Sequence, residues 1–223
     1  METRDRPDVP WQRAPRAAAF AGILFAALLI TSFSLIRLAV PADPLEAGAW
    51  LAARSGTVVL ALNLVPFAGV AFLWFVGVLR DRLAEREDRL FATVFLGSGL
   101  LFLAMLFVSA AMVGSLVVAY RAAPEQLLGT PTFRSARAVA YEIMNVYAIK
   151  MAAVFMMATS SLGLRTGFIA RWVAVLGLAV ALGLLLVGRS VEGILLAFPF
   201  WVLVTSLSIL AEDARRRRAP AGP

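Results

Sequence analysis

The residues of this chain that could do chemistry stand inside apolar sequence. Glu142, Asn145 and Lys150 interrupt one apolar stretch, and at 100° per residue of an α-helix they fall within one polar sector. An ionised side chain at the middle of a bilayer costs about 3 kcal/mol on insertion scales, so such residues face protein or water and are candidates for function. The chemistry they offer is a polar track, in which Glu142 accepts a proton or cation, Asn145 orients it, and Lys150 serves as counter-ion or anion site.

The same residues also fit a purely structural network. In that interpretation Glu142 pairs with an arginine near the outer face, and Lys150 hydrogen-bonds to polar groups of neighbouring helices. The arginines near enough in the predicted topology are Arg37, Arg134 and Arg137. The sequence leaves the functional and the structural interpretations of Glu142 and Lys150 open.

Asn63 is a further polar candidate inside an apolar stretch. It lies three residues before Pro66, whose ring removes a backbone donor and frees a carbonyl about one turn earlier. Such a kink can expose a carbonyl to an ion, or it is only a bend that neighbouring helices repair. Asn63 is also a candidate hydrogen-bond partner for Lys150.

The chain contains no cysteine and no histidine. Disulfides, iron–sulfur clusters, thiolate zinc sites, histidine-ligated haem and Ser-His-Asp catalysis are therefore excluded. We expect no catalytic residues, no metal site and no cofactor, and the protein is not predicted to be an enzyme. An intramembrane enzyme that acts on lipid is the least favoured class.

The elements that must position these residues are membrane-spanning helices. The chain is 61% hydrophobic and 16% charged, with a mean hydropathy of +0.84, which lies outside the soluble globular range. Each apolar stretch is near the roughly 20 residues that a helix needs to cross a bilayer, and the stretches lack the alternation of barrel strands. We predict a single all-α domain over 1–223, a bundle of six transmembrane helices with cytoplasmic tails 1–16 and 212–223. The helices are predicted at about 17–39, 56–79, 91–119, 137–163, 170–188 and 192–211.

The placement of arginine predicts the orientation, because short cytoplasmic loops carry an excess of Lys and Arg. The richer side carries Arg4, Arg6, Arg13, Arg16, Arg80, Arg82, Arg86, Arg89, Arg165, Arg171 and the run 215–218. The poorer side carries Arg54, Arg121, Arg134, Arg137 and Arg189, with Arg37 near its edge. Both termini of this multi-pass membrane protein are therefore predicted to be cytoplasmic.

The bilayer itself is the main predicted partner. The net charge is +7, but the arginines flank apolar segments instead of forming a basic face, so no nucleic acid partner is expected. The basic run after the last helix can bind anionic lipid at about 1 kcal/mol per residue, or it only fixes the orientation of that helix. This run consists of Arg215, Arg216, Arg217 and Arg218.

Small residues and charged segments predict further local features. Small residues four apart allow close helix contact, within the bundle or between copies of the chain. The pairs are Gly177/Ala181, Ala179/Gly183, Ala110/Gly114 and Ala111/Ser115. Residues 80–89 are expected to extend the second helix into the cytoplasm. The connection 121–137 is expected to be irregular, because it contains Pro124, Gly129 and Pro131.

Two segments resemble a known family. Residues 147–172 (YAIKMAAVFMMATSSLGLRTGFIARW) and 66–82 (PFAGVAFLWFVGVLRDR) are similar to segments of a family of uncharacterised actinobacterial integral membrane proteins. The resemblance implies six helices and a plasma-membrane location. It implies no activity, and no catalytic residues carry over.

Two functions are therefore open. The first is a small transporter or channel-like protein that uses the polar track on the fourth helix. The alternative is a non-catalytic accessory or structural subunit that binds membrane proteins or anionic lipid, as a homo-oligomer or with another membrane protein. A water-filled cavity beside Glu142 and Lys150 would favour transport, and packed partners would favour the accessory role.

Overall fold

All regular secondary structure in the described part of the chain is helical. The computed structural model describes residues 14–43, 45–83, 89–186 and 193–218, and the prediction of an all-α fold is confirmed. In chain order the helices are α1 (Ala14–Ala39), α2 (Trp50–Leu83), α3 (Arg89–Ala122), α4 (Pro124–Leu127), α5 (Pro131–Glu142), the π-helical turn η2 (Ile143–Ala148), α6 (Ile149–Thr166), α7 (Arg171–Leu186) and α8 (Ile194–Arg218).

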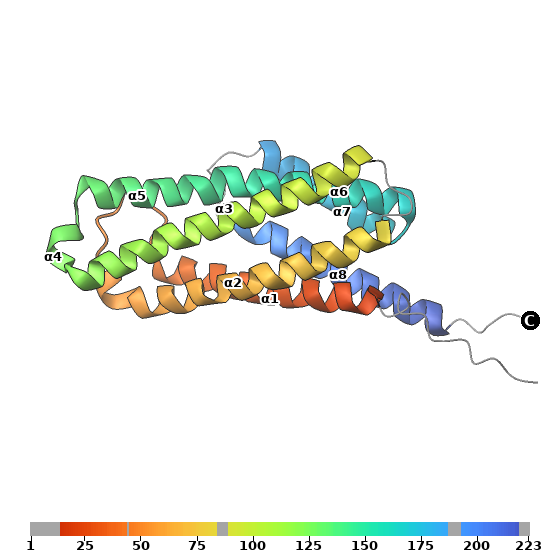
Figure 1. The fold of residues 1–223 in the computed structure, drawn as a ribbon, viewed down its shortest axis with the longest axis horizontal. Helices are drawn as coiled ribbons and strands as arrows, with labels where there is room; N and C mark the ends of the chain where they lie inside the picture. The colour runs from red at the N-terminus through yellow and green to blue at the C-terminus, as the bar shows by residue number, and fades with distance from the viewer. Residues whose placement is uncertain (1–13, 44, 84–88, 187–192, 219–223) are drawn as a thin grey trace, which may run out of the picture.

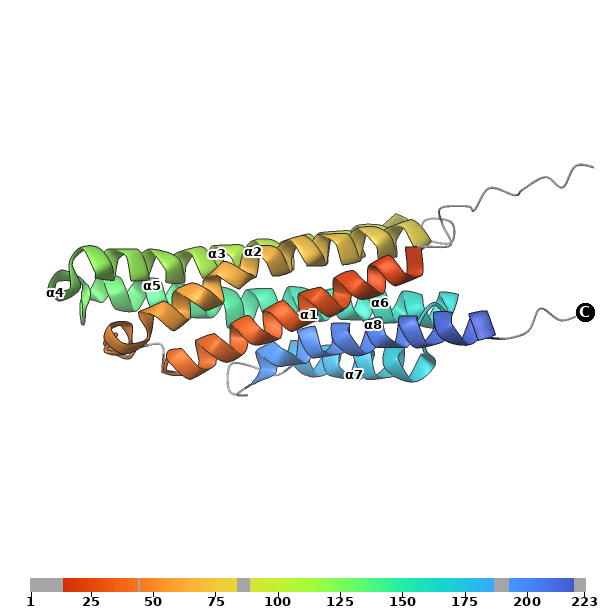
Figure 2. The ribbon, with the colours of Figure 1, turned by 90° about the horizontal axis from the view of Figure 1, so that it is seen from below.

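The long helices lie side by side along one axis (Figure 1, Figure 2). α1 begins and α8 ends at one end of the bundle, and α4 lies at the opposite end, which we call the α4 end. α1 packs mainly against α2 and α8, and α6 packs against α3 and α7. α7 and α8 lie beside the half of the bundle that is farther from α4, so the helices at the α4 end are fewer.

Five segments are long and apolar enough to cross a membrane. Four are single helices, Ala17–Ala39, Trp50–Arg80, Ala92–Ala122 and Ile194–Arg215. The fifth, Pro131–Thr166, joins α5, η2 and α6 into one rod. α7 is apolar but has 16 residues. Its length is therefore about 24 Å, which is short of the ~30 Å of hydrocarbon in a bilayer.

The connection that was expected to be irregular is mostly helical, so that expectation is wrong. α4 and α5 occupy much of 121–137, and the fourth span begins at Pro131 instead of near 137. Pro124 and Pro131 each start a helix, where the fixed φ of proline suits the helix and its missing N–H costs little. Thr130 caps α5 by accepting a backbone hydrogen bond, and Gly129, at φ +72°, makes the turn before it.

Other helix boundaries also differ from the predicted ones. α2 begins at Trp50 instead of near 56, and it continues through Pro66 without ending there. Residues 84–88 of the predicted extension of the second helix lie outside the described residues. α8 continues to residue 218, so the start of the predicted C-terminal tail is helical, and 1–13 and 219–223 lie outside the described residues.

Six phenylalanine side chains form the centre of the core. They come from α1, α2, α3, α6 and α8, and each is less than 2% exposed. Rings in contact have centroids 4.7 to 6.0 Å apart, and each such pair stabilises the fold by about 1 kcal/mol beyond the burial of its area. We call this set the aromatic cluster, and it consists of Phe25, Phe72, Phe95, Phe102, Phe155 and Phe198.

Small residues let α7 approach its neighbours. A methyl group added at Gly177 would overlap Ser160 Oγ of α6 and would lie 2.5 Å from Trp201 Nε1 of α8. Ala181, one turn later, is also buried, whereas a Cβ on Gly183 would meet nothing within 4 Å. Of the two small-residue pairs noted in this helix, Gly177 and Ala181 therefore face the neighbouring helices.

Replacing Gly177 by alanine should destabilise the bundle, because the added methyl group overlaps side chains of two neighbouring helices. Overpacking of this kind costs about 1–3 kcal/mol, which exceeds the gain in helix propensity of about 1 kcal/mol. The Tm of the purified protein in detergent, followed by tryptophan fluorescence, should fall for Gly177→Ala. Gly183→Ala is the matched control in the same helix, and its Tm should stay or rise. Equal Tm values for the two variants would contradict this packing.

Candidate functional site

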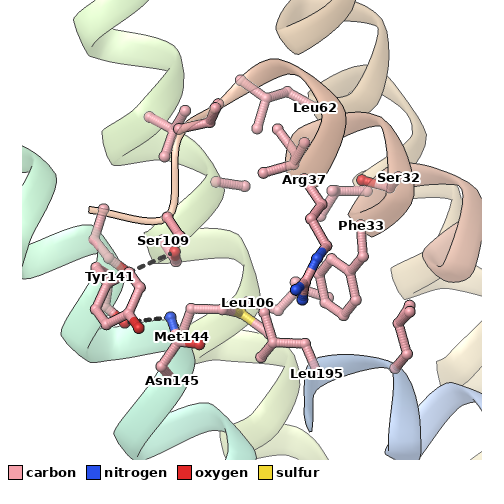
Figure 3. A pocket seen from close by; sticks show the side chains of 18 of the residues that line it. Ser32, Phe33, Arg37, Leu62, Leu106, Ser109, Tyr141, Met144, Asn145 and Leu195 are labelled. Carbon is pink, nitrogen blue, oxygen red and sulfur yellow. Dashed lines mark hydrogen bonds between the residues drawn. The ribbon is translucent and has the colours of Figure 1, made fainter. Parts of the chain in front are cut away.

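A cavity of about 480 Å³ lies in the half of the bundle nearer the α4 end. Its walls come from α1, α2, α3, α5, η2 and α8, together with residues 40–42 after α1 (Figure 3). A volume of this size suits a small organic ligand. The apolar wall includes Phe33, Ile36, Leu62, Val65, Leu106 and Val113. The polar side chains are those of Ser32, Arg37, Ser109, Arg137, Tyr141 and Asn145.

The aromatic cluster lies beyond the cavity on the side away from α4. In α3, Phe102 lies one turn beyond the cavity residue Leu106 in that direction. In α8, Phe198 follows the cavity residue Leu195 in the same direction. The deeper aromatic residues of the other three segments are Phe25, Phe72 and Phe155. Among the described residues, the lining of the cavity therefore ends before the buried rings of the aromatic cluster.

Arg37 brings a positive charge into the cavity. It stands in the last turn of α1, and its guanidinium points into the cavity beside Phe33, across from Tyr141 and Asn145 (Figure 3). Its Nη1 lies 3.8 Å from where a Cβ of Gly193 would be, at the start of α8. Because the N-terminus of a helix carries partial positive charge, Arg37 and the first turn of α8 together favour an anion.

Arg137 lines the same cavity but bonds to the protein. The residue is 6% exposed. Its Nη1 donates to Glu46 O at 2.9 Å and to Glu46 Oε2 at 3.1 Å, and its Nη2 donates to Pro41 O at 2.7 Å. The guanidinium carbon lies 5.7 Å from the ring centroid of Trp50, within the range of a cation–π contact. A buried guanidinium needs such acceptors, because without them it loses its hydration and gains nothing in exchange.

Glu46 extends this contact to the start of α2. Besides Arg137, its carboxylate accepts hydrogen bonds from Gly48 N at 2.9 Å and from Ala49 N at 3.1 Å. Gly48 has φ +99°, a conformation that glycine adopts without strain. We call Arg137, the Glu46 carboxylate and the carbonyls of Pro41 and Glu46 the arginine brace. The brace joins α5 to the connection between α1 and α2, along the edge of the cavity.

The wall opposite Arg37 contains the π-helical turn η2. A π-helical turn interrupts the regular hydrogen-bond ladder of an α-helix, and such turns are frequent at functional sites. Ser109 Oγ donates to Ala140 O at 2.9 Å, just before the turn. Asn145 Nδ2 donates to Tyr141 O, also at 2.9 Å (Figure 3). Both polar side chains thus donate to backbone carbonyls. The wall therefore leaves fewer hydrogen-bond donors for a ligand than its residue types indicate.

The structure separates the residues of the predicted polar track. Asn145 lines the cavity together with Arg37, another predicted site residue. Lys150 and Asn63 are exposed, and Glu142 is half-buried with contacts of its own. None of these three is among the described residues that line the cavity. The prediction of one polar sector assumed 100° per residue, and the π-helical turn between Glu142 and Lys150 changes that angle.

Apart from Arg37 and Arg137, none of the predicted arginines lines the cavity within the described part of the chain. Of the arginines considered as partners of Glu142, Arg137 pairs with Glu46 and Arg134 is exposed. The basic run 215–218 forms the end of α8. Arg215 is exposed there, and the side chains of 216–218 lie outside the described residues.

The sequence interpretation missed the arginine brace. It places Arg137 at the edge of an external loop, whereas the residue stands inside α5. The sequence contains a signal for this, because an arginine interrupts a stripe of otherwise apolar residues at helical spacing. The stripe consists of Phe133, Arg137, Ala140 and Met144, which are all buried. An arginine inside such a stripe indicates a buried cation that needs acceptors.

No family model, curated protein or solved structure matches this chain. The family resemblance of the two segments, and the plasma-membrane location that it implies, therefore stay predictions. Within the described ranges, no three acidic side chains gather as a metal site would require. The function is thus inferred from the geometry of the cavity.

Replacing Arg137 by glutamine should destabilise the protein. The change removes the donor to Pro41 O and leaves the Glu46 carboxylate without its cation, and loss of one partner of a buried pair costs about 3 kcal/mol. The Tm in detergent should therefore fall by about 5–10 °C. Arg134→Gln, on the exposed side of the same helix, is the matched control and should change the Tm little. A similar Tm for both variants would mean that the brace does not stabilise the fold.

Proposed function

We propose that this chain is a plasma-membrane protein that spans the bilayer six times, with both ends in the cytoplasm and the cavity toward the other side. The start of α1 and the end of α8 lie at the same end of the bundle, as an even number of crossings requires (Figure 1). The arginine excess at that end supports the cytoplasmic assignment. α7 supplies the sixth crossing, and its apolar run continues in the sequence to residue 188.

The function that we propose is the binding of an amphiphilic ligand in the cavity. One observation carries this proposal: the guanidinium of Arg37 points into a cavity whose walls are mostly apolar (Figure 3). Apolar walls favour a hydrocarbon group, since its burial removes apolar surface from water. A cation at the edge of the cavity favours a polar group of opposite charge.

Binding is better supported than conduction of ions along a polar track. The Asn145 amide donates to Tyr141 O, and Glu142 and Lys150 do not line the cavity. An ion in the cavity would lose hydration against apolar walls, and packed rings of the aromatic cluster lie beyond its lining. Transport would need a second conformation in which these rings separate, whereas binding needs only the conformation described here.

An accessory role is the second candidate, and Lys150 favours it. Lys150 is exposed near the middle of the span Pro131–Thr166, and its neighbour Tyr147 is 58% exposed. An ammonium group that faces hydrocarbon is costly. A carboxylate from another membrane protein, or from another copy of this chain, would offset that cost. In this role the chain is a non-catalytic subunit whose basic run 215–218 contacts anionic lipid at the cytoplasmic face.

Cysteine labelling in cells tests the topology. The chain contains no cysteine, so a single introduced cysteine reports its own position. Glu125→Cys, in the exposed part of α4, should react with a membrane-impermeant maleimide in intact cells. Ala214→Cys, near the end of α8, should react only after the cells are permeabilised. The proposed orientation is wrong if Ala214→Cys reacts in intact cells.

Filling the cavity tests the binding function. Ala110 lines the cavity, whereas the next residue of α3, Ala111, is exposed and does not line it. Each protein is transferred from native membrane into nanodiscs, and the nanodiscs are extracted with solvent. The wild type and Ala111→Phe should both release an amphiphile that copurifies with the protein. Ala110→Phe should release several-fold less, because its phenyl group occupies the cavity. A single symmetrical elution peak checks that each variant is folded. Equal release from all three proteins would place the copurifying molecule outside the cavity and contradict the proposal.

A further inference from the structure

We infer that the ligand of this cavity is a single-chain anionic amphiphile, whose acidic head group contacts Arg37 and whose hydrocarbon chain lies along the apolar wall. The inference rests on the proposed binding function and adds the chemical class of the ligand. A carboxylate and a phosphate monoester, each on one chain of medium length, share this chemistry.

The charge of the cavity selects an anion. Among the described residues that line it, Arg37 and Arg137 are the charged ones, and no acidic residue is present. Arg137 already donates to Pro41 and Glu46. The guanidinium of Arg37 has several N–H donors, so a contact within the protein leaves others for a carboxylate or phosphate. Hydrogen bonds between such charged groups are roughly twice as strong as those between neutral groups.

Three of the neutral polar side chains of the wall already donate to backbone carbonyls. Ser32 Oγ donates to Ala61 O at 2.8 Å. Ser109 and Asn145 donate to carbonyls beside the π-helical turn. A sugar or a peptide in the cavity would have to compete with the backbone carbonyls for these donors. Its own polar groups would also lose their hydration without gaining hydrogen bonds in exchange. The part of the ligand that lies beyond Arg37 is therefore apolar.

The volume of the cavity admits one chain. Cavities of about 300–1,000 Å³ hold drug-sized ligands, and 480 Å³ lies in the lower part of this range. A chain of medium length with its head group is a ligand of that size. A phospholipid with two chains exceeds it.

The position of Arg37 sets the direction of the chain. Arg37 stands at the end of α1, and Phe33 lies one turn deeper in the bundle. Leu106 of α3 and Leu195 of α8 line the same cavity (Figure 3). A chain that extends from Arg37 therefore runs between α1, α3 and α8 and ends at the aromatic cluster, near Phe102.

Photo-crosslinking with a defined probe tests this inference. The full-length protein in nanodiscs of zwitterionic lipid is incubated with dodecanoate that carries a diazirine at its chain end, and the labelled residues are mapped by peptide mass spectrometry. We expect saturable labelling near Leu106 and Leu195. Arg37→Gln should weaken labelling about tenfold through loss of a charge-assisted hydrogen bond. Arg54→Gln, an exposed arginine of α2, should leave it unchanged, and Arg37→Lys, which keeps the charge, should restore most of it.

Matched probes separate the head group from the chain. Dodecanol with the same diazirine should label the cavity far less than dodecanoate, and its labelling should not respond to Arg37→Gln. Competition by unlabelled dodecanoate and by dodecyl phosphate distinguishes a carboxylate from a phosphate head group. Acetate and inorganic phosphate, which lack a chain, should not compete.

Three outcomes would overturn the inference. If dodecanol labels the cavity as well as dodecanoate, or if Arg37→Gln does not change the labelling by dodecanoate, the ligand is not selected by charge. The binding function would still stand in that case if Ala110→Phe removes the copurifying molecule. If phosphatidic acid, with two chains, competes as well as dodecyl phosphate, the single-chain class is wrong. If dodecanoate does not label the cavity and Ala110→Phe also releases as much amphiphile as the wild type, the binding function itself fails.

Discussion

The burial of the Arg137 guanidinium is the constraint on which the α4 end of the bundle depends. A charged residue with 6% exposure is tolerated because two backbone carbonyls and the Glu46 carboxylate accept its hydrogen bonds at 2.7 to 3.1 Å. These acceptors belong to the connection between α1 and α2, so a shift of that connection would leave the charge unpaired. Since residues 40–42 line the cavity, the brace also fixes the edge of the cavity and the end of α1 that carries Arg37.

The π-helical turn shapes the opposite wall. The turn changes the angle between successive side chains of the rod formed by α5, η2 and α6. Asn145 lines the cavity, whereas Lys150, after the turn, is exposed. Ser109 and Asn145 donate to carbonyls beside the turn, which satisfies the polar groups that the irregular backbone would otherwise leave open. These two donors of the wall are therefore used within the protein, and most of the residues that line the cavity are apolar.

Helices could be predicted from this sequence because the constraint that produces them is local in the chain. A backbone in hydrocarbon must bond to itself, and an apolar stretch of about 20 residues is visible without tertiary information. The prolines at 124 and 131 misled the prediction, since proline starts helices as readily as it ends them. The cavity could not be predicted, because it depends on Arg137 and Glu46, 91 residues apart, and on a change of helix phase. Lys150 illustrates this, since it was predicted on an interior track and is exposed after the π-helical turn.

The position of the aromatic cluster beyond the cavity determines how a ligand can enter and leave. Phe72 of α2 contacts rings from α1, α3, α6 and α8, so no one of these helices can move alone without losing contacts of about 1 kcal/mol each. A chain bound as proposed, with its head group at Arg37, buries its apolar surface without moving any ring of the cluster. To leave by the far end it would have to separate several rings at once, and it would gain no new partner for its charge. Exit on the side of Arg37 would leave these rings in place, and this asymmetry supports the proposed binding of an amphiphile over its conduction across the bundle.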